Sequence, residues 1–193
     1  MNIFILDKDP VVAAQLQCDK HVPKMVVESA QMLSTAHRVL DGKLTRKPSK
    51  SGKTMVKYWD LYEGVDDLEA ELLYYKAVHV GHPCTVWTME SDSNYKWHYQ
   101  HFIALCDEYT YRYGKLHKTA RELGSALYSV PKNIPKGPLT EFPLAMKSNP
   151  ECFFWGDPVK SYRAFYQTKQ DRFKMVWTNR EVPSWFNMEK CNG

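Results

Sequence analysis

The sequence has no run of about 18 apolar residues, the length that a membrane-spanning helix needs, and no basic segment followed by an apolar core at its start. It contains no internal repeat and no low-complexity tract. Its five cysteines are an odd number without a close pair, which argues against a disulfide scaffold and for a reducing compartment. We therefore expect a cytoplasmic protein with no membrane partner.

Signatures of several enzyme classes are missing as well. No Gly-x-Ser-x-Gly elbow and no motif around a cysteine nucleophile is present. Residues 51–54 match the second half of a phosphate-binding loop, but position 47 carries Lys where that loop needs Gly. We predict no metal and no other cofactor, and keep a nucleotide- or metal-dependent hydrolase as an alternative, because short Cys and His groupings match no zinc-finger, zinc-ribbon or deaminase spacing. These groupings are Cys18 with His21, His79 with His82 and Cys84, and His98 with His101.

What the sequence does contain is ordinary globular composition with many aromatic rings. Hydrophobic residues make up 44% and charged residues 25%, and 193 residues are enough for one well-buried core. Aromatic residues reach 13%, including six Trp. The net charge of +4 permits a polyanionic partner without requiring one. We expect a single domain over residues 1–193, with a monomer favoured.

Helical spacing predicts an all-α fold, because no pair of alternating strands is evident. Residues 43–57 are basic and polar and predict a mobile loop, whereas repeated prolines make 129–150 a long irregular connection. A short extended segment over 1–7 leads to a helix start at Asp9-Pro10. The main helices are expected over 20–40 with Asp19 as N-cap, over 58–80, from Ser91 or Asp92 to Gly114, and from Pro158 through 176.

The 20–40 helix carries a polar stripe beside an apolar one. At about 100° per residue, an apolar face gathers while His21, Lys24 and Glu28 lie on successive turns along its flank. An imidazole, an ammonium and a carboxylate are the groups that proton transfer and charge stabilisation use. We expect the three side chains to face a shared cleft. The apolar face consists of Met25, Met32, Leu33, Ala36, Val39 and Leu40.

Three short motifs resemble one family. The run from Asp19 through His21 to Glu28 resembles the Asp-x-His-x6-Glu core of the phage pyrimidine-dimer glycosylases known as endonuclease V. Gly81-His82, followed by an aromatic-bearing segment, is similar to that family's Gly-His-Val-Thr-Phe-Phe stretch. Residues 182–186, Val-Pro-Ser-Trp-Phe, are similar to its Pro-x-Trp-Tyr tail. The matches fall in the same order and cover about a fifth of the chain.

The resemblance implies a compact α-helical DNA-repair enzyme that excises cyclobutane pyrimidine dimers and nicks the abasic site. It implies the α-amine of the chain as nucleophile, here that of Met1, with a helix carboxylate, here Glu28, beside it. An α-amine loses its proton closer to neutral pH than a lysine does, so part of it is free to attack a sugar C1′ and form a Schiff base. His21 and Lys24 complete the predicted catalytic set.

The chain also departs from the family's pattern. Asn2 stands where the family has Thr and is large enough for Met1 to be retained, so the amine is that of Met1 itself. The amine lies about six residues further upstream of the histidine than in the family. Val27 and Gln31 replace two arginines of the family. These departures leave room for a relative with a changed reaction.

Duplex DNA is the predicted partner, because basic loops and aromatic wedges are what kinks a damaged duplex and turns a base out of it. A non-catalytic nucleic-acid-binding protein is an alternative. Against that alternative, a pure binder has no reason to place Glu28, a repulsive charge, beside a phosphate groove. The predicted DNA-contacting residues are Arg46, Lys47, Lys50, Lys53, His82, Arg163, Lys169, Arg172 and Trp185.

Overall fold

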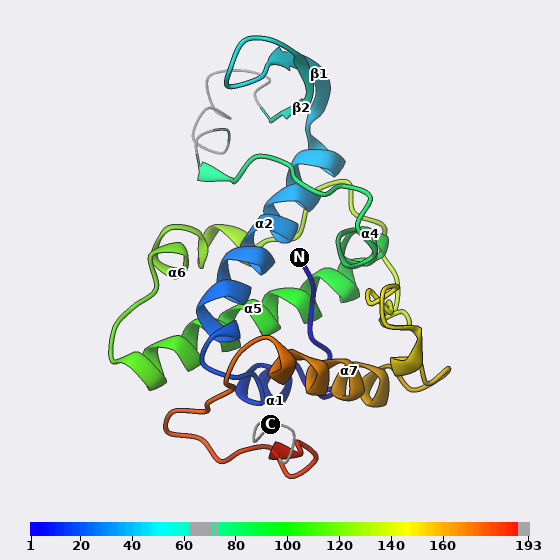
Figure 1. Ribbon diagram of the computed structural model, residues 1–193. Coiled ribbons are helices and arrows are strands. Elements are labelled where there is room, and N and C mark those ends of the chain that lie inside the picture. The colour runs from blue at the N-terminus through cyan, green and yellow to red at the C-terminus, as the bar shows by residue number, and fades with distance from the viewer. Residues whose placement is uncertain (62–70, 72, 189–193) are drawn as a thin grey trace.

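The computed structural model describes residues 1–61, 71 and 73–188. It confirms the helical class, with 48% helix, 7% strand and one small two-stranded hairpin. The long helices α2 and α5 pack on each other, α1 packs on α5, and α4 packs on both long helices (Figure 1). The helices are α1 (Pro10–Gln15), α2 (His21–Asp41), α4 (Pro83–Glu90), α5 (Asp92–Tyr113), α6 (Lys118–Leu123) and α7 (Pro158–Gln167). No described helix is long and apolar enough to span a bilayer.

Helix α2 forms where its two-stripe pattern predicts, and its apolar face is buried at Met25, Met32 and Leu33. Asp19 does not cap it, because its carboxylate accepts hydrogen bonds from the N–H of Thr178 at 2.9 Å and from Arg112 at 2.9 Å. The predicted cap is therefore wrong. Asp19 instead ties the start of α2 to α5 and to the C-terminal segment.

Helix α5 begins and ends at the predicted residues. The hydroxyl of Ser91 accepts a hydrogen bond from the N–H of Asn94 at 3.1 Å, which caps the first turn. Gly114 follows the last turn with a φ of 65°, in the left-handed region that side-chain-bearing residues avoid. These two caps hold α5 as the long support under α1 and α2.

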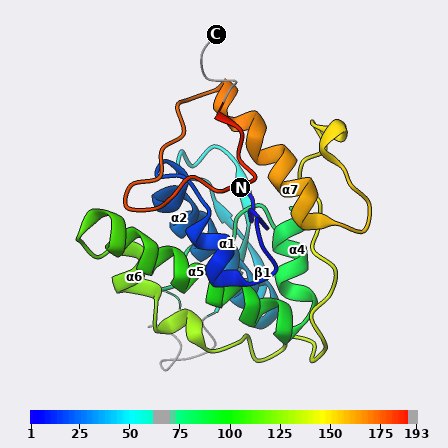
Figure 2. The same cartoon turned by 90° about the horizontal axis from the view of Figure 1, so that it is seen from below.

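The first residues of the chain are extended, as predicted, and they run through the middle of the fold. Figures 1 and 2 show this segment passing from the centre of the molecule down to α1. Ile3, Phe4, Ile5 and Leu6 are each at most 5% exposed. Burial of four large apolar side chains fixes the segment firmly, which sets the position of Met1.

The basic segment 43–57 forms a hairpin with the residues after it, so the predicted mobile loop is wrong. Strands β1 (Lys43–Pro48) and β2 (Met55–Asp60) pair antiparallel and project from the C-terminal end of α2 (Figure 1). The β-branched and aromatic residues of the two strands favour this pairing. The basic residues that dominate the composition remain compatible with it because they lie at the surface.

The predicted helix over 58–80 is wrong at both of its ends. Its first three residues belong to β2 and residues 75–79 have no regular structure, whereas residues 71 and 73 are helical. Residues 62–70 and 72 lie outside the described part of the chain.

The C-terminal third matches the prediction in part. Residues 129–149 are irregular, as their prolines predict. Helix α7 ends at Gln167 rather than at 176, and a short 3₁₀ turn, Thr168–Asp171, follows it. The hydroxyl of Thr168 bonds the carbonyl of Phe165 at 2.8 Å. The chain beyond this turn folds back over α7.

Candidate active site

The amine of Met1 and the carboxylate of Glu28 lie together. The Met1 nitrogen is 3.5 Å from Oε2 of Glu28, and the two side chains are only 4% and 14% exposed. The same oxygen accepts a hydrogen bond from the N–H of Asn2 at 3.1 Å. Lys24, one turn earlier on α2, places its Nζ 3.4 Å from the other carboxylate oxygen. Three of the four predicted catalytic residues thus meet.

Asn2 holds this arrangement in place. Its Oδ1 lies 3.1 Å from the hydroxyl of Tyr162 on α7 and 3.5 Å from the thiol of Cys84 on α4. Burial raises the pKa of the Cys84 thiol to about 11, so the thiol stays protonated and donates. Sequence reasoning assigned no site role to Asn2, Tyr162 or Cys84. The one sequence signal for a role of Asn2 was its position next to the α-amine.

His21 occupies a different environment from Glu28. Its Nδ1 is 2.7 Å from the hydroxyl of Tyr166, and its ring stacks on Phe4 with centroids 4.8 Å apart. Burial, reinforced by Lys24 and neighbouring lysines, lowers the pKa of His21 to about 4. The prediction that the three side chains face one cleft is therefore wrong for His21: Lys24 and Glu28 pair with each other, while His21 turns into the aromatic core. It anchors α2 to the N-terminal segment and to α7.

His82, predicted as a DNA contact, lies at the start of α4 close to Met1. Its Nδ1 accepts a hydrogen bond from the N–H of Cys84 at 3.2 Å and caps the helix. Burial, followed by the positive charge of the Met1 amine, lowers the pKa of His82. A neutral imidazole therefore stands beside the amine and Glu28.

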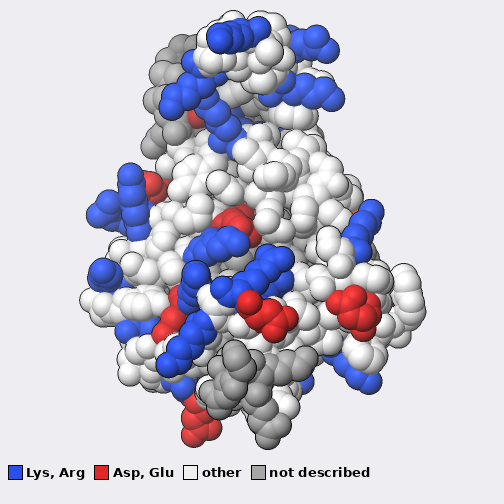
Figure 3. Space-filling model, viewed as in Figure 1, with Lys and Arg blue, Asp and Glu red and all other residues white. Residues whose placement is uncertain are grey.

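Basic side chains also lie near the pair formed by the Met1 amine and Glu28. Nζ of Lys169 lies 3.4 Å from the centroid of the Phe165 ring, and burial together with the charge of Arg172 lowers the pKa of Lys169 to about 8. The charge of Lys24 contributes to the same shift. Figure 3 shows basic side chains beside an acidic one at the centre of the face that it views. The predicted contacts Lys169 and Arg172 thus lie on the side of Lys24.

Arg163 and Trp185, both predicted DNA contacts, interact with each other and with their own chain. Nε of Arg163 donates to the carbonyl of Leu6 at 2.8 Å, and its guanidinium lies 5.3 Å from the centroid of the Trp185 ring. Trp185 is half-buried, with its carbonyl bonded to Gln167. The tail folds back on α7 and uses both residues, which line a cavity of about 470 Å³.

The four predicted contacts of the hairpin divide into two kinds. Arg46, Lys50 and Lys53 are exposed. Lys47 pairs with the carboxylate of Asp60, and its Nζ lies 4.0 Å from the ring centroid of Tyr58. Lys47 is therefore not a free cation for phosphate.

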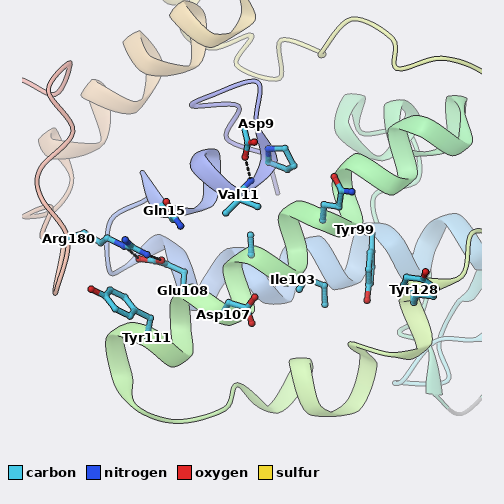
Figure 4. Close-up of a pocket in the computed structure, with 13 residues that line it drawn as sticks. Asp9, Val11, Gln15, Tyr99, Ile103, Asp107, Glu108, Tyr111, Tyr128 and Arg180 are labelled. Atoms are coloured by element: carbon cyan, nitrogen blue, oxygen red, sulfur yellow. Dashed lines mark hydrogen bonds and ion pairs between the residues drawn. The ribbon is translucent and has the colours of Figure 1, made fainter.

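A separate cavity of about 660 Å³ lies between α1 and α5 (Figure 4). At one end, Glu108 is 2% exposed, and its Oε1 accepts hydrogen bonds from Arg112 at 2.7 Å and from Arg180 at 3.0 Å. Arg180 also lies 4.4 Å from the centroid of the Tyr111 ring. This carboxylate is satisfied by internal partners, and none of the predicted catalytic residues lines the cavity.

Within the described ranges, no three His, Cys, Asp or Glu side chains come together as a group that could hold a metal ion. Comparisons of the chain with models of known protein families, with curated proteins and with solved structures found no match.

Proposed function

We propose that the chain is a DNA glycosylase with abasic-site lyase activity that acts on damaged pyrimidines in duplex DNA. The observation that carries the proposal is the Met1 nitrogen 3.5 Å from the carboxylate of Glu28. An amine nucleophile and a carboxylate are the two groups that the motif resemblance implies. The cations Lys24, Lys169 and Arg172 nearby supply a positive field for a phosphate backbone.

In the proposed reaction, the neutral amine of Met1 forms a bond to C1′ while the bond from C1′ to the base breaks. The base leaves with that electron pair and takes a proton from solvent. The nitrogen then loses a proton, and the C1′–O4′ bond opens with O4′ taking its electron pair and a proton, which gives a protonated imine. Removal of a C2′ proton expels the 3′ phosphate, and water hydrolyses the imine and frees the amine.

The neighbouring side chains have distinct roles in this scheme. Oε2 of Glu28 is placed to accept the proton that the amine loses, and its charge stabilises the cationic imine. The ammonium of Lys24 is 61% exposed and open to a DNA phosphate. His82 offers a neutral imidazole on the side of α4.

The substitution Glu28→Gln tests the proposal on duplexes that carry one cyclobutane pyrimidine dimer or one abasic site. We expect the variant to bind as the parent does while strand cleavage falls by roughly 10² or more, because the cationic intermediate loses its counter-charge. The matched control is Glu122→Gln on α6, where the carboxylate is 40% exposed and pairs with Lys118. It should cleave as the parent does.

Two results would contradict the proposal. Full cleavage by Glu28→Gln removes the carboxylate from the mechanism. If the parent protein binds damaged duplexes tightly but cleaves none of them, the chain is a non-catalytic DNA-binding protein.

A further inference from the structure

One face of the β1–β2 hairpin is bound to the protein. Thr45 donates its hydroxyl hydrogen to Asp60 at 2.7 Å, and Lys47 pairs with the same carboxylate. Tyr58, directly opposite Thr45 in the register, bonds the carboxylate of Glu71. Alternation along the strands puts these side chains on one face of the ribbon.

The other face carries two like charges opposite each other. Arg46 pairs in register with Lys57, both are exposed, and no described residue forms an ion pair with either. Leu44 and Met55 lie on the same face, 55% and 56% exposed. Like charges directly opposite are destabilising in a sheet, so this pair is explained best by an external anion between them.

The base of the hairpin is fixed rather than hinged. Arg38, near the end of α2, is 1% exposed and donates hydrogen bonds to the carbonyls of Trp59 at 3.0 Å and Tyr75 at 2.7 Å. It also pairs with Glu71 at 2.8 Å. A buried guanidinium with several acceptors holds β2 in one orientation on α2.

Helix α2 sets the distance between the hairpin and the candidate active site. From Glu28 to Gly42 the chain advances 14 helical positions, about 21 Å at 1.5 Å per residue. Arg46 lies four residues beyond Gly42, which adds up to about 13 Å along β1. Duplex DNA advances about 3.4 Å per base pair, so the charged pair of the hairpin lies about six to ten base pairs from Glu28. Figure 1 shows the hairpin at the far end of α2 from α7.

We infer that the hairpin is a second contact for duplex DNA, which holds the backbone about six to ten base pairs to one side of the damaged nucleotide. Arg46 and Lys57 bind phosphates there, and a two-stranded ribbon has a width that a major groove admits. The identity of the partner rests on the proposed function. The placement rests on the register of the hairpin and on the length of α2.

The test compares Arg46→Gln/Lys57→Gln with Lys96→Gln/Lys118→Gln. The control removes the same charge from two exposed lysines that pair with acidic neighbours on α5 and α6. On a long duplex with a central abasic site, the hairpin variant should bind roughly tenfold more weakly, with a log–log salt slope smaller by about 1.8. Its hydroxyl-radical footprint should lose protection on one side only, about six to ten base pairs from the lesion. The control should match the parent.

A short duplex and an undamaged duplex separate the possible failures. On a duplex that ends about four base pairs from the lesion, parent and hairpin variant should bind equally; an equal loss on short and long duplexes overturns the inference. An unchanged footprint on the long duplex overturns it as well, even if cleavage depends on Glu28. If the protein cleaves nothing but the salt slope on undamaged duplex still falls in the hairpin variant, the inference stands and the proposed reaction fails.

Discussion

Deep burial keeps several histidines neutral in the folded protein. His21, His37 and His101 are at most 6% exposed, and desolvation lowers the pKa of each to about 4. Two of them hydrogen-bond tyrosine hydroxyls, and Nδ1 of His101 lies 2.9 Å from the carbonyl of Pro10. Their function is to join helices through neutral hydrogen bonds within the core.

These histidines predict an acid-sensitive fold. In the unfolded chain each titrates near pH 6.5, so their contribution to stability is complete above that pH and is lost as the pH falls toward 4. Burial also lowers the pKa of His98 well below its usual value, so four histidines together should lower the free energy of unfolding by about 4–5 kcal/mol per unit between pH 6 and pH 5. Urea unfolding at these two pH values measures the slope. His101→Gln should reduce the slope by about a quarter; a stability that does not change over this range contradicts the assignment.

Some residue roles could be predicted from sequence and others could not. The helical period alone places Glu28 and Lys24 on one stripe of α2, and the structure keeps them together. Arg46 faces outward, whereas Lys47 pairs with Asp60. The two residues differ in this way because the segment is a strand, and the basic composition of 43–57 predicted a loop instead. The hydrogen bond from Arg163 to the carbonyl of Leu6 depends on the N-terminal segment lying beside α7, which no local pattern encodes.

At the scale of elements, Arg38 connects α2 to the hairpin and to the segment that follows. Its guanidinium donates hydrogen bonds to the carbonyls of Trp59, Tyr74 and Tyr75 and to the carboxylate of Glu71. In a helix, the carbonyls of Tyr74 and Tyr75 would bond backbone N–H groups instead. This explains why the helix predicted over 58–80 does not extend across these residues: a buried cation more than 30 positions upstream takes their acceptors.

Removing that cation should free the hairpin. Arg38→Ala leaves a carboxylate and several carbonyls without their donor, so we expect a loss of about 3–5 kcal/mol in the free energy of unfolding. Limited digestion with trypsin should then cleave first at the basic residues of 43–57. Arg121→Ala, at an exposed position on α6, is the control. Equal protection of the hairpin from trypsin in both variants would contradict the conclusion that Arg38 holds it in place.

At the scale of the whole molecule, the fold delivers its own amino terminus to the middle of α2. The apolar residues 3–6 pass through the core, and Asn2 fixes the end of that segment against α4 and α7. Helical class and the face of α2 could be predicted from periodicity. The meeting of Met1 and Glu28 could not, because it joins residues far apart in sequence through a buried extended segment; only the motif resemblance anticipated it.

Borohydride trapping tests the central claim most directly. Reduction of the imine on an abasic duplex should link the DNA covalently to the protein, and mass spectrometry of the digested complex should place the link on the α-amine of Met1. Protein with a folded tag before Met1, or with an acetylated amine, should give no complex, whereas the same tag at the C-terminus should leave trapping unchanged. A link on Lys24 or Lys169, trapping that survives a blocked amine, or no trapping of the untagged protein would contradict the assignment of Met1 as the nucleophile.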